Sequence, residues 1–272
     1  MKAEWRDHVD ALLEHTNAIL RLSQDIFDRR IEYTASDKTE LMILGYASRQ
    51  DGHLSAVQDL VRGGHHSDAT LIARTMFEGA AQLTWALSNF PERPEMWFWY
   101  GIVEDWRQVQ ANRARGIEIE AEQQSALDEA MKDRGEDYLT VKTRKKLEKG
   151  ESVHADPYRR KWLEFDLASI CHQLDESWVN YYNQIYRTFS DWVHWSPRSL
   201  FLNVEFENGN ATALRKENPH SAAVALKVGE FALYRMLRIL NWKFDLGIEE
   251  ELETHHDAFS AEANKVLPLP FG

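Results

Sequence analysis

Two charged side chains stand one helical turn apart inside an otherwise apolar stretch of the chain. Arg74 and Glu78 are four residues apart in a segment with helical apolar spacing, so both side chains point to the same face. A guanidinium beside a carboxylate can form a surface ion pair, a buried structural pair, or part of a ligand site. His53, on the preceding predicted helix, is either a satisfied core histidine or a further member of that site.

A second group of polar side chains recurs every four residues further along the chain. Tyr186, Ser190 and His194 share one face of a predicted helix, and Asp191 lies three residues before the histidine. A carboxylate about one turn from a histidine can fix its tautomer and raise its basicity, which suits acid–base or anion-binding chemistry. The alternative is a tyrosine-rich packing stripe with a polar end.

Together these positions suggest one polar cluster between three central helices. Its members are His53, Arg74, Glu78, Ser190 and His194. Such a cluster is either a structural network or the binding site of a small anionic ligand or partner, and it needs no catalytic step. The binding interpretation requires its members to converge below the protein surface.

The same residues resemble a widespread prokaryotic family of helical proteins that is classed as a domain of unknown function. The resemblance rests on the motifs Arg74-Thr75-x-x-Glu78 and Tyr186-x-x-x-Ser190-x-x-x-His194, and it spans roughly residues 40–200. It implies an all-helical fold and a polar cluster shared by three helices, and it implies no activity.

A weaker similarity, to the HEPN superfamily, supplies an alternative function. Ribonucleases of that superfamily carry an arginine, four to six residues, and then a histidine on one helix, and Arg187 and His194 match this spacing. The similarity implies metal-independent RNA cleavage in stress response or phage defence. Arg187 would then stabilise the scissile phosphate and His194 would act as general acid or base, both in an exposed cleft.

No motif points to a metal, a cofactor or a nucleophilic triad. HExxH, GxxxxGK[ST], GxGxxG and GxSxG are all absent from the sequence. Of three Glu-x-x-His pairs, the kind that di-iron bundles use, two fall in predicted loops and the third, Glu253 with His256, lies near the C-terminus. The single cysteine, Cys171, excludes an intrachain disulfide. We therefore expect no cofactor and no metal site.

Charge and composition narrow the class of function. The 272 residues carry a net charge of −12, which does not favour a broad nucleic-acid surface. The basic stretch at 142–149 is expected to be a solvated loop or, alternatively, a phosphate contact. No apolar run approaches the length of a membrane span, and the first residues lack a signal-peptide core. We expect a cytoplasmic protein without membrane association. We expect it to bind nucleic acid only under the ribonuclease alternative.

Helical apolar spacing through most of the chain predicts an all-α, multi-helix bundle. Asp37 and Glu40 form a predicted capping box, Gly63-Gly64 should end the helix that it begins, and His65 and His66 should cap a helix end. The expected helices cover residues 4–31, 37–63, 67–89, 91–115, 118–134, 158–173, 176–195, 218–246 and 248–263.

The predicted organisation is a single helical domain at 1–265, with a core at roughly 37–246 and a tail at 266–272. Residues 135–157 are expected to be a loop or mobile segment. Alternating apolar residues before an Asn-Gly pair predict at most one short β-hairpin, near 200–215.

The aromatic content predicts a homodimer. Ten tryptophans and the apolar run at 96–103 supply more aromatic surface than one core needs, and aromatic residues are enriched at interfaces. Light scattering at micromolar concentration should therefore give twice the chain mass of 31.7 kDa. The mass of a single chain would contradict this prediction.

Overall fold

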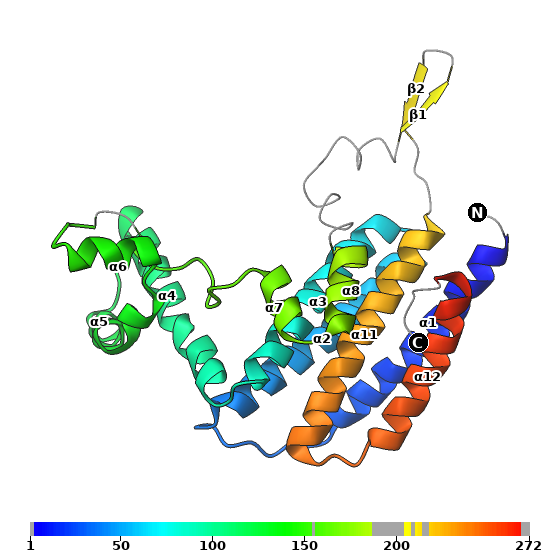
Figure 1. The fold of residues 1–272 in the computed structure, drawn as a ribbon, viewed down its shortest axis with the longest axis horizontal. Coiled ribbons are helices and arrows are strands. Elements are labelled where there is room, and N and C mark those ends of the chain that lie inside the picture. Colours follow the sequence, from blue (N-terminus) through cyan, green and yellow to red (C-terminus); the bar gives the residue numbers. More distant parts are fainter. Residues whose placement is uncertain (1–2, 154–155, 187–203, 208–209, 214–217, 268–272) are drawn as a thin grey trace. The chain divides into compact units, whose positions relative to one another are not determined.

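The structure, a computed structural model, describes residues 3–153, 156–186, 204–207, 210–213 and 218–267. Regular structure in these residues is predominantly helical, which confirms the predicted all-α class (Figure 1). The elements are α1 (Ala3–Asp28), α2 (Lys38–Arg62), α3 (His66–Leu87), α4 (Glu92–Ala114), α5 (Ala121–Arg134), the 3-10 turn η1 (Gly135–Tyr138), α6 (Val141–Glu148), α7 (Leu167–Gln173), α8 (Glu176–Tyr181), the π-helical turn η2 (Tyr182–Tyr186), β1 (Val204–Glu207), β2 (Asn210–Ala213), α11 (Pro219–Phe244) and α12 (Glu249–Val266).

The expected hairpin is also present. Strands β1 and β2 pair antiparallel, with Val204 opposite Ala213 and Glu207 opposite Asn210. This register confirms the predicted hairpin pairing for the described residues 204–207 and 210–213.

Contacts between residues divide the chain into two compact units. The first comprises Met1–Trp85 and Leu167–Gly272, and the second comprises Ala86–Asp166. The single domain that the sequence predicts over residues 1–265 stays a prediction. No helix in the described ranges is both long enough and apolar enough to cross a membrane.

Helix α11 forms the centre of the first unit. Every residue from Ser221 to Tyr234 is buried, and the helix packs against α1, α2 and α12. Figure 1 shows α11 in orange between α2 and α12. The approach to α2 is close, because a Cβ atom at Gly229 would lie 2.9 Å from Leu54 Cδ1. A larger residue at this position would force the Leu54 side chain to move.

A buried glutamine joins α2 to α3. The Gln50 amide Nε2 donates to the Met76 backbone oxygen at 2.8 Å, and a Cβ atom at Gly79 would lie 2.8 Å from that same nitrogen. The bond gives the amide nitrogen a partner away from water, and the glycine leaves room for it. This contact positions the face of α3 that carries Arg74 and Glu78.

The ends of α2 follow the expected signals with one difference. Asp37 Oδ1 accepts from the backbone N–H groups of Thr39 at 2.8 Å and Glu40 at 3.2 Å. Glu40 accepts from Thr34 N at 2.6 Å, whereas the Asp37 N–H donates to Thr34 O. The predicted capping box therefore forms in one direction only. At the other end, Gly64 has φ +75°, which confirms the predicted stop.

In the second unit, Arg107 of α4 forms hydrogen bonds that hold residues 156–159, in the segment after α6. Its guanidinium bonds Asp156 Oδ2 at 2.7 Å, the Tyr100 hydroxyl at 2.8 Å and the backbone oxygens of Tyr158 and Arg159 at 3.2 and 2.6 Å. Those two carbonyls are thereby satisfied outside a helix. The helix predicted over 158–173 is wrong in its first half for this reason, and α7 begins only at Leu167.

The segment expected to be a loop, 135–157, contains regular structure. Thr140 accepts from Thr143 N at 3.1 Å and caps α6, which covers most of the basic stretch at 142–149. The prediction that this stretch is a loop is wrong over the residues of α6. The threonine N-cap begins a helix there, and the basic side chains of that helix stay in solvent. The 3-10 turn η1 precedes it.

The helix predicted over 176–195 is described as far as Tyr186. Asp175 caps it, since its Oδ1 accepts from Ser177 N at 2.9 Å. After six residues, α8 widens into the π-helical turn η2, across which Tyr182 stacks on Tyr186 with ring centroids 5.3 Å apart. Residues 187–195 lie outside the described part of the chain.

Replacing Asp37 by alanine should lower the free energy of unfolding by about 1–2 kcal/mol, because two backbone donors of α2 lose their cap. Lys243 Nζ also loses its 3.0 Å bond to Asp37 Oδ2. Burial alone would raise the pKa of Asp37, but the hydrogen bonds from Lys243, Glu40 and Thr39 hold it below the ordinary value.

A lowered carboxyl pKa stabilises the folded state above the unfolded pKa of about 3.9, and this contribution disappears as the pH falls through the folded pKa. Urea denaturation of wild type and Asp37→Ala should therefore differ at neutral pH and converge in acid. Asp25→Ala, an exposed carboxylate on α1, is the matched control. A deficit that is equal at all pH values would contradict the role of the ionised cap.

Candidate functional site

Arg74 projects from α3 onto Tyr186, the last residue of η2. Its Nη2 donates to the Tyr186 hydroxyl at 2.8 Å, and its Cζ lies 4.4 Å from the centroid of the Tyr186 ring. The Nε atom is buried without a hydrogen-bond partner among the described residues. The guanidinium is thus fixed by one bond and one aromatic face, while part of its donor capacity is unused.

The Tyr186 phenol is protonated at neutral pH. Burial raises its pKa, the bond from Arg74 opposes this, and the Glu78 charge raises it further, with a net increase. Since the hydroxyl oxygen accepts from Arg74, its hydrogen is directed elsewhere and is available to a second acceptor. Phe77 packs beside the tyrosine ring with centroids 6.1 Å apart.

Glu78 belongs to a chain of polar contacts between α2 and α3. Gln82 Nε2 donates to Glu78 Oε1 at 3.4 Å, and the Tyr46 hydroxyl donates to Gln82 Oε1 at 3.4 Å. Glu78 is half-buried and acts electrostatically on Tyr186. Arg74 therefore contacts Tyr186, and the Glu78 charge acts on the same hydroxyl.

His53 makes its side-chain contact within its own helix. Its Nε2 accepts from Arg49 Nε at 3.2 Å. Burial lowers the pKa of His53 and the Arg49 charge lowers it further, so the imidazole is neutral at pH 7. Because Nε2 accepts from Arg49, one turn away on α2, the hydrogen of the neutral ring is on Nδ1.

The remaining predicted site residues lie outside the described part of the chain. These are Arg187, Ser190 and His194. Their membership of the cluster stays a prediction, as does the pairing of Arg187 with His194 that the ribonuclease alternative needs.

A buried acid–base pair that the sequence analysis missed joins α11 to α12. Glu230 is 1% exposed, and its Oε1 lies 3.0 Å from His256 Nδ1. The Tyr234 ring stacks on the imidazole with centroids 3.8 Å apart, and its hydroxyl donates to both carboxylate oxygens of Glu253 at 2.8 Å. Lys227, one turn before Glu230, bonds Asn264 Oδ1 at 3.2 Å.

Two signals in the sequence could have located this pair. Glu230 is a carboxylate inside the long apolar stretch of α11, where an ionised group needs a partner. His256 stands in the Glu253-x-x-His256 motif, which was considered only as half of a metal site. Among the described residues no group of three or more histidine, cysteine or acidic side chains could hold a metal ion.

The pair holds a proton more firmly than its isolated members. Burial lowers the pKa of His256, but the bond to Glu230 and the charges of Glu230, Glu253 and Asp257 give a net increase. Complete burial raises the pKa of Glu230, and His256 and Lys227 only partly oppose this. Both shifts oppose the loss of the shared proton in the folded state.

Cys171 of α7 offers no nucleophile. It is a free thiol with 0% exposure, and burial raises its pKa to about 12. The thiolate, which is the reactive form, is therefore scarce at neutral pH.

Comparison with known proteins gives one family. The family model described as a family of unknown function (DUF5677) matches residues 40–211, well over half of the chain. This confirms the resemblance that the Arg74-to-Glu78 and Tyr186-to-His194 motifs carry. No curated protein and no solved structure matches the chain.

Replacing Glu230 by glutamine should remove a pH-dependent part of the stability. A raised histidine pKa stabilises the folded state fully below the unfolded pKa of about 6.5, and this contribution is lost as the pH rises through the folded pKa. The advantage of wild type over Glu230→Gln in unfolding free energy should therefore shrink as the pH rises from about 6 to 9.

Chemical denaturation across this pH range measures the effect. His255→Gln, which changes the neighbouring histidine on α12, should leave the pH dependence of wild type in place. Parallel pH profiles for wild type and Glu230→Gln would show that the pair does not titrate with folding.

Proposed function

We propose that this chain, which belongs to the family of unknown function DUF5677, is a non-catalytic protein that binds a small anionic ligand at Arg74. Arg74 and Glu78 of α3 and the Tyr186 hydroxyl of η2 form the described part of the proposed site. The sequence adds His53 of α2, Ser190 and His194 as further members.

The observation that carries the proposal is the incomplete pairing of the Arg74 guanidinium. One nitrogen is anchored to Tyr186 at 2.8 Å, while the buried Nε has no hydrogen-bond partner in the described part of the chain. A buried donor without a partner costs about 1–3 kcal/mol. An anion that accepts from Arg74 would remove this cost and form charge-assisted hydrogen bonds.

The neighbours of Arg74 define what kind of anion suits the site. The protonated Tyr186 hydroxyl supplies a second donor beside the guanidinium. Glu78 adds a negative charge near the same hydroxyl, which opposes a ligand with several negative charges. A monoanion such as a carboxylate fits this balance better than a polyphosphate or a nucleic acid.

The finer parts of the proposal rest on the sequence. If the four-residue period continued beyond Tyr186, Ser190 and His194 would follow on the same face and complete the donor set. We also propose a cytoplasmic location and a homodimer, on the composition already described. The ribonuclease alternative retains its dependence on Arg187 and His194.

Replacing Arg74 by glutamine should weaken the binding of a monoanion at least tenfold, which is about 1.4 kcal/mol. Acetate is the probe, and the readout is the Nε–H signal of Arg74 in nitrogen-15 NMR spectra as acetate is added. Tyr186→Phe should weaken binding as well, because it removes the second donor. Thr75→Ala, which alters the next residue of α3, should bind as wild type does.

Two results would contradict the proposal. One is an Arg74 signal that does not respond to acetate while the protein is folded by circular dichroism. The other is cleavage of mixed RNA in EDTA by wild type and none by His194→Ala, which would favour the ribonuclease alternative.

A further inference from the structure

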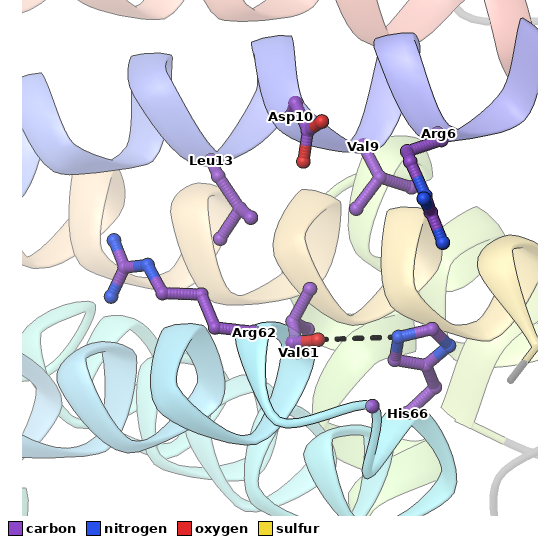
Figure 2. Close-up of a pocket in the computed structure, with 8 residues that line it drawn as sticks. Arg6, Val9, Asp10, Leu13, Val61, Arg62 and His66 are labelled. Carbon is purple, nitrogen blue, oxygen red and sulfur yellow. Dashed lines mark hydrogen bonds between the residues drawn. The ribbon is translucent and has the colours of Figure 1, made fainter. Parts of the chain in front are cut away.

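A pocket lies in the first unit where α1 crosses the turn between α2 and α3. Its volume is about 270 Å³. Three apolar side chains form part of its wall: Val9 and Leu13 from α1, and Val61 from the last turn of α2. Figure 2 shows Arg6 and Asp10 descending from α1 into the pocket and His66 facing them from the start of α3.

The histidine in this pocket has a defined donor nitrogen. His66 is 5% exposed, and its Nε2 lies 3.2 Å from the Val61 backbone oxygen. A carbonyl oxygen only accepts, so Nε2 carries the hydrogen. This bond satisfies one of the last carbonyls of α2 and confirms that His66 caps a helix end.

The other nitrogen of the ring is buried and unsatisfied. His66 Nδ1 has no hydrogen-bond partner among the described residues. In the neutral imidazole this nitrogen carries a lone pair and requires a donor. Figure 2 shows it on the side of the ring below the Arg6 guanidinium, away from the bond to Val61. The pocket therefore presents one buried acceptor to whatever occupies it.

Charges of both signs surround this acceptor. Arg6 and Asp10 stand exposed at the mouth, one turn apart on α1. Arg62 lies on the far side, where Asn17 Oδ1 and Gln58 Oε1 hold its Nη2 at 2.8 and 3.3 Å, so that its stem forms a wall (Figure 2). The first turn of α3 adds the partial positive charge of a helix N-terminus.

We propose that this pocket binds a small zwitterion, an α-amino acid with a short aliphatic side chain. The ammonium group would donate to His66 Nδ1 and to the Asp10 carboxylate, and the carboxylate would accept from Arg6. The aliphatic side chain would contact Val9, Leu13 and Val61. This site shares no residue with the Arg74 cluster and does not depend on that proposal.

Size and charge argue against other occupants. Pockets for larger ligands typically span roughly 300–1,000 Å³, so a pocket of 270 Å³ favours a small molecule. The Asp10 carboxylate would repel a dianion such as hydrogen phosphate, which also offers Nδ1 fewer hydrogen-bond donors than an ammonium group does. A purely apolar molecule leaves Nδ1 unsatisfied, at the cost of a buried polar group without a partner.

L-valine tests the proposal, with two analogues that each lack one charge: isobutylamine and 3-methylbutanoate. The readout is the ring nitrogen signals of His66 in protein labelled with nitrogen-15 histidine. We expect Nε2 to carry the hydrogen in the free protein, and L-valine to shift the Nδ1 signal until it saturates. Each analogue should bind at least tenfold more weakly than L-valine, because it loses one ionic partner.

Three variants separate the contacts. His66→Gln keeps an amide donor for the Val61 oxygen and removes the Nδ1 acceptor, so it should fold and lose L-valine binding at least tenfold in calorimetry. Arg6→Gln and Asp10→Asn should each weaken binding to a similar extent. Arg21→Gln, an exposed arginine on the same helix about 22 Å along its axis, should bind as wild type does.

Several results would overturn the proposal. One is a His66 signal that stays unchanged with L-valine up to about 10 mM, which would leave only water as the partner of Nδ1. Another is a hydrogen on Nδ1 in the free protein. Equal binding of 3-methylbutanoate and L-valine would replace the zwitterion by a simple carboxylate, and unaltered binding by folded His66→Gln would remove the histidine from the site.

Discussion

Helix α11 is buried without interruption from Ser221 to Tyr234, and the first unit is arranged around this burial. A helical segment without a solvated face needs neighbours on several sides, and α1, α2 and α12 provide them. Any polar group that α11 carries must also be satisfied inside the protein. Lys227 and Glu230 are such groups, and their partners Asn264 and His256 both come from α12. The register of α12 against α11 is thus defined by two polar contacts as well as by apolar packing.

The polar groups of the first unit fall into two kinds. Glu230 and His256 satisfy each other, and Tyr234 covers the imidazole, so the pair needs no further ligand. Arg74 and His66 are different, because each has one nitrogen fixed by the protein and another that is buried without a partner. A satisfied network stabilises the fold, whereas a buried nitrogen without a partner can take a ligand as its partner. Arg74 and His66 lie on α3, two turns apart.

Local signals in the sequence were sufficient for α2 and for most other helices, but not for α6 or for the first half of the helix predicted over 158–173. Asp37 and Gly63-Gly64 bound α2 as expected, because capping depends on residues adjacent in the chain. The non-helical course of 158–166 was missed because its cause is Arg107, about fifty residues earlier. The capping box failed in one direction because Thr34 takes both the Asp37 N–H and the Glu40 carboxylate.

The candidate site was predictable only in part, for a related reason. Arg74 and Glu78 are one turn apart, so their common face follows from the helical period. The partner of Arg74 is Tyr186, and a spacing of 112 residues contains no information about distance. The π-helical turn η2 adds a further difficulty, because it ends at Tyr186 and departs from the regular α-helical period on which the prediction rested. Glu230 and His256 were missed because they lie on different helices, 26 residues apart, and His256 was considered only as part of a metal motif.

Because Cys171 is buried, its reaction with thiol reagents can report how often the structure around it opens. The chain has one sulfhydryl, on the short helix α7, and it is inaccessible in the folded state. A reagent that modifies thiols can reach it only when α7 detaches or the unit unfolds. The modification rate at increasing reagent concentration would separate these two events, because it reports the opening equilibrium when reclosing is fast and the opening rate when reclosing is slow. The single native thiol thus reports how often the first unit exposes its interior.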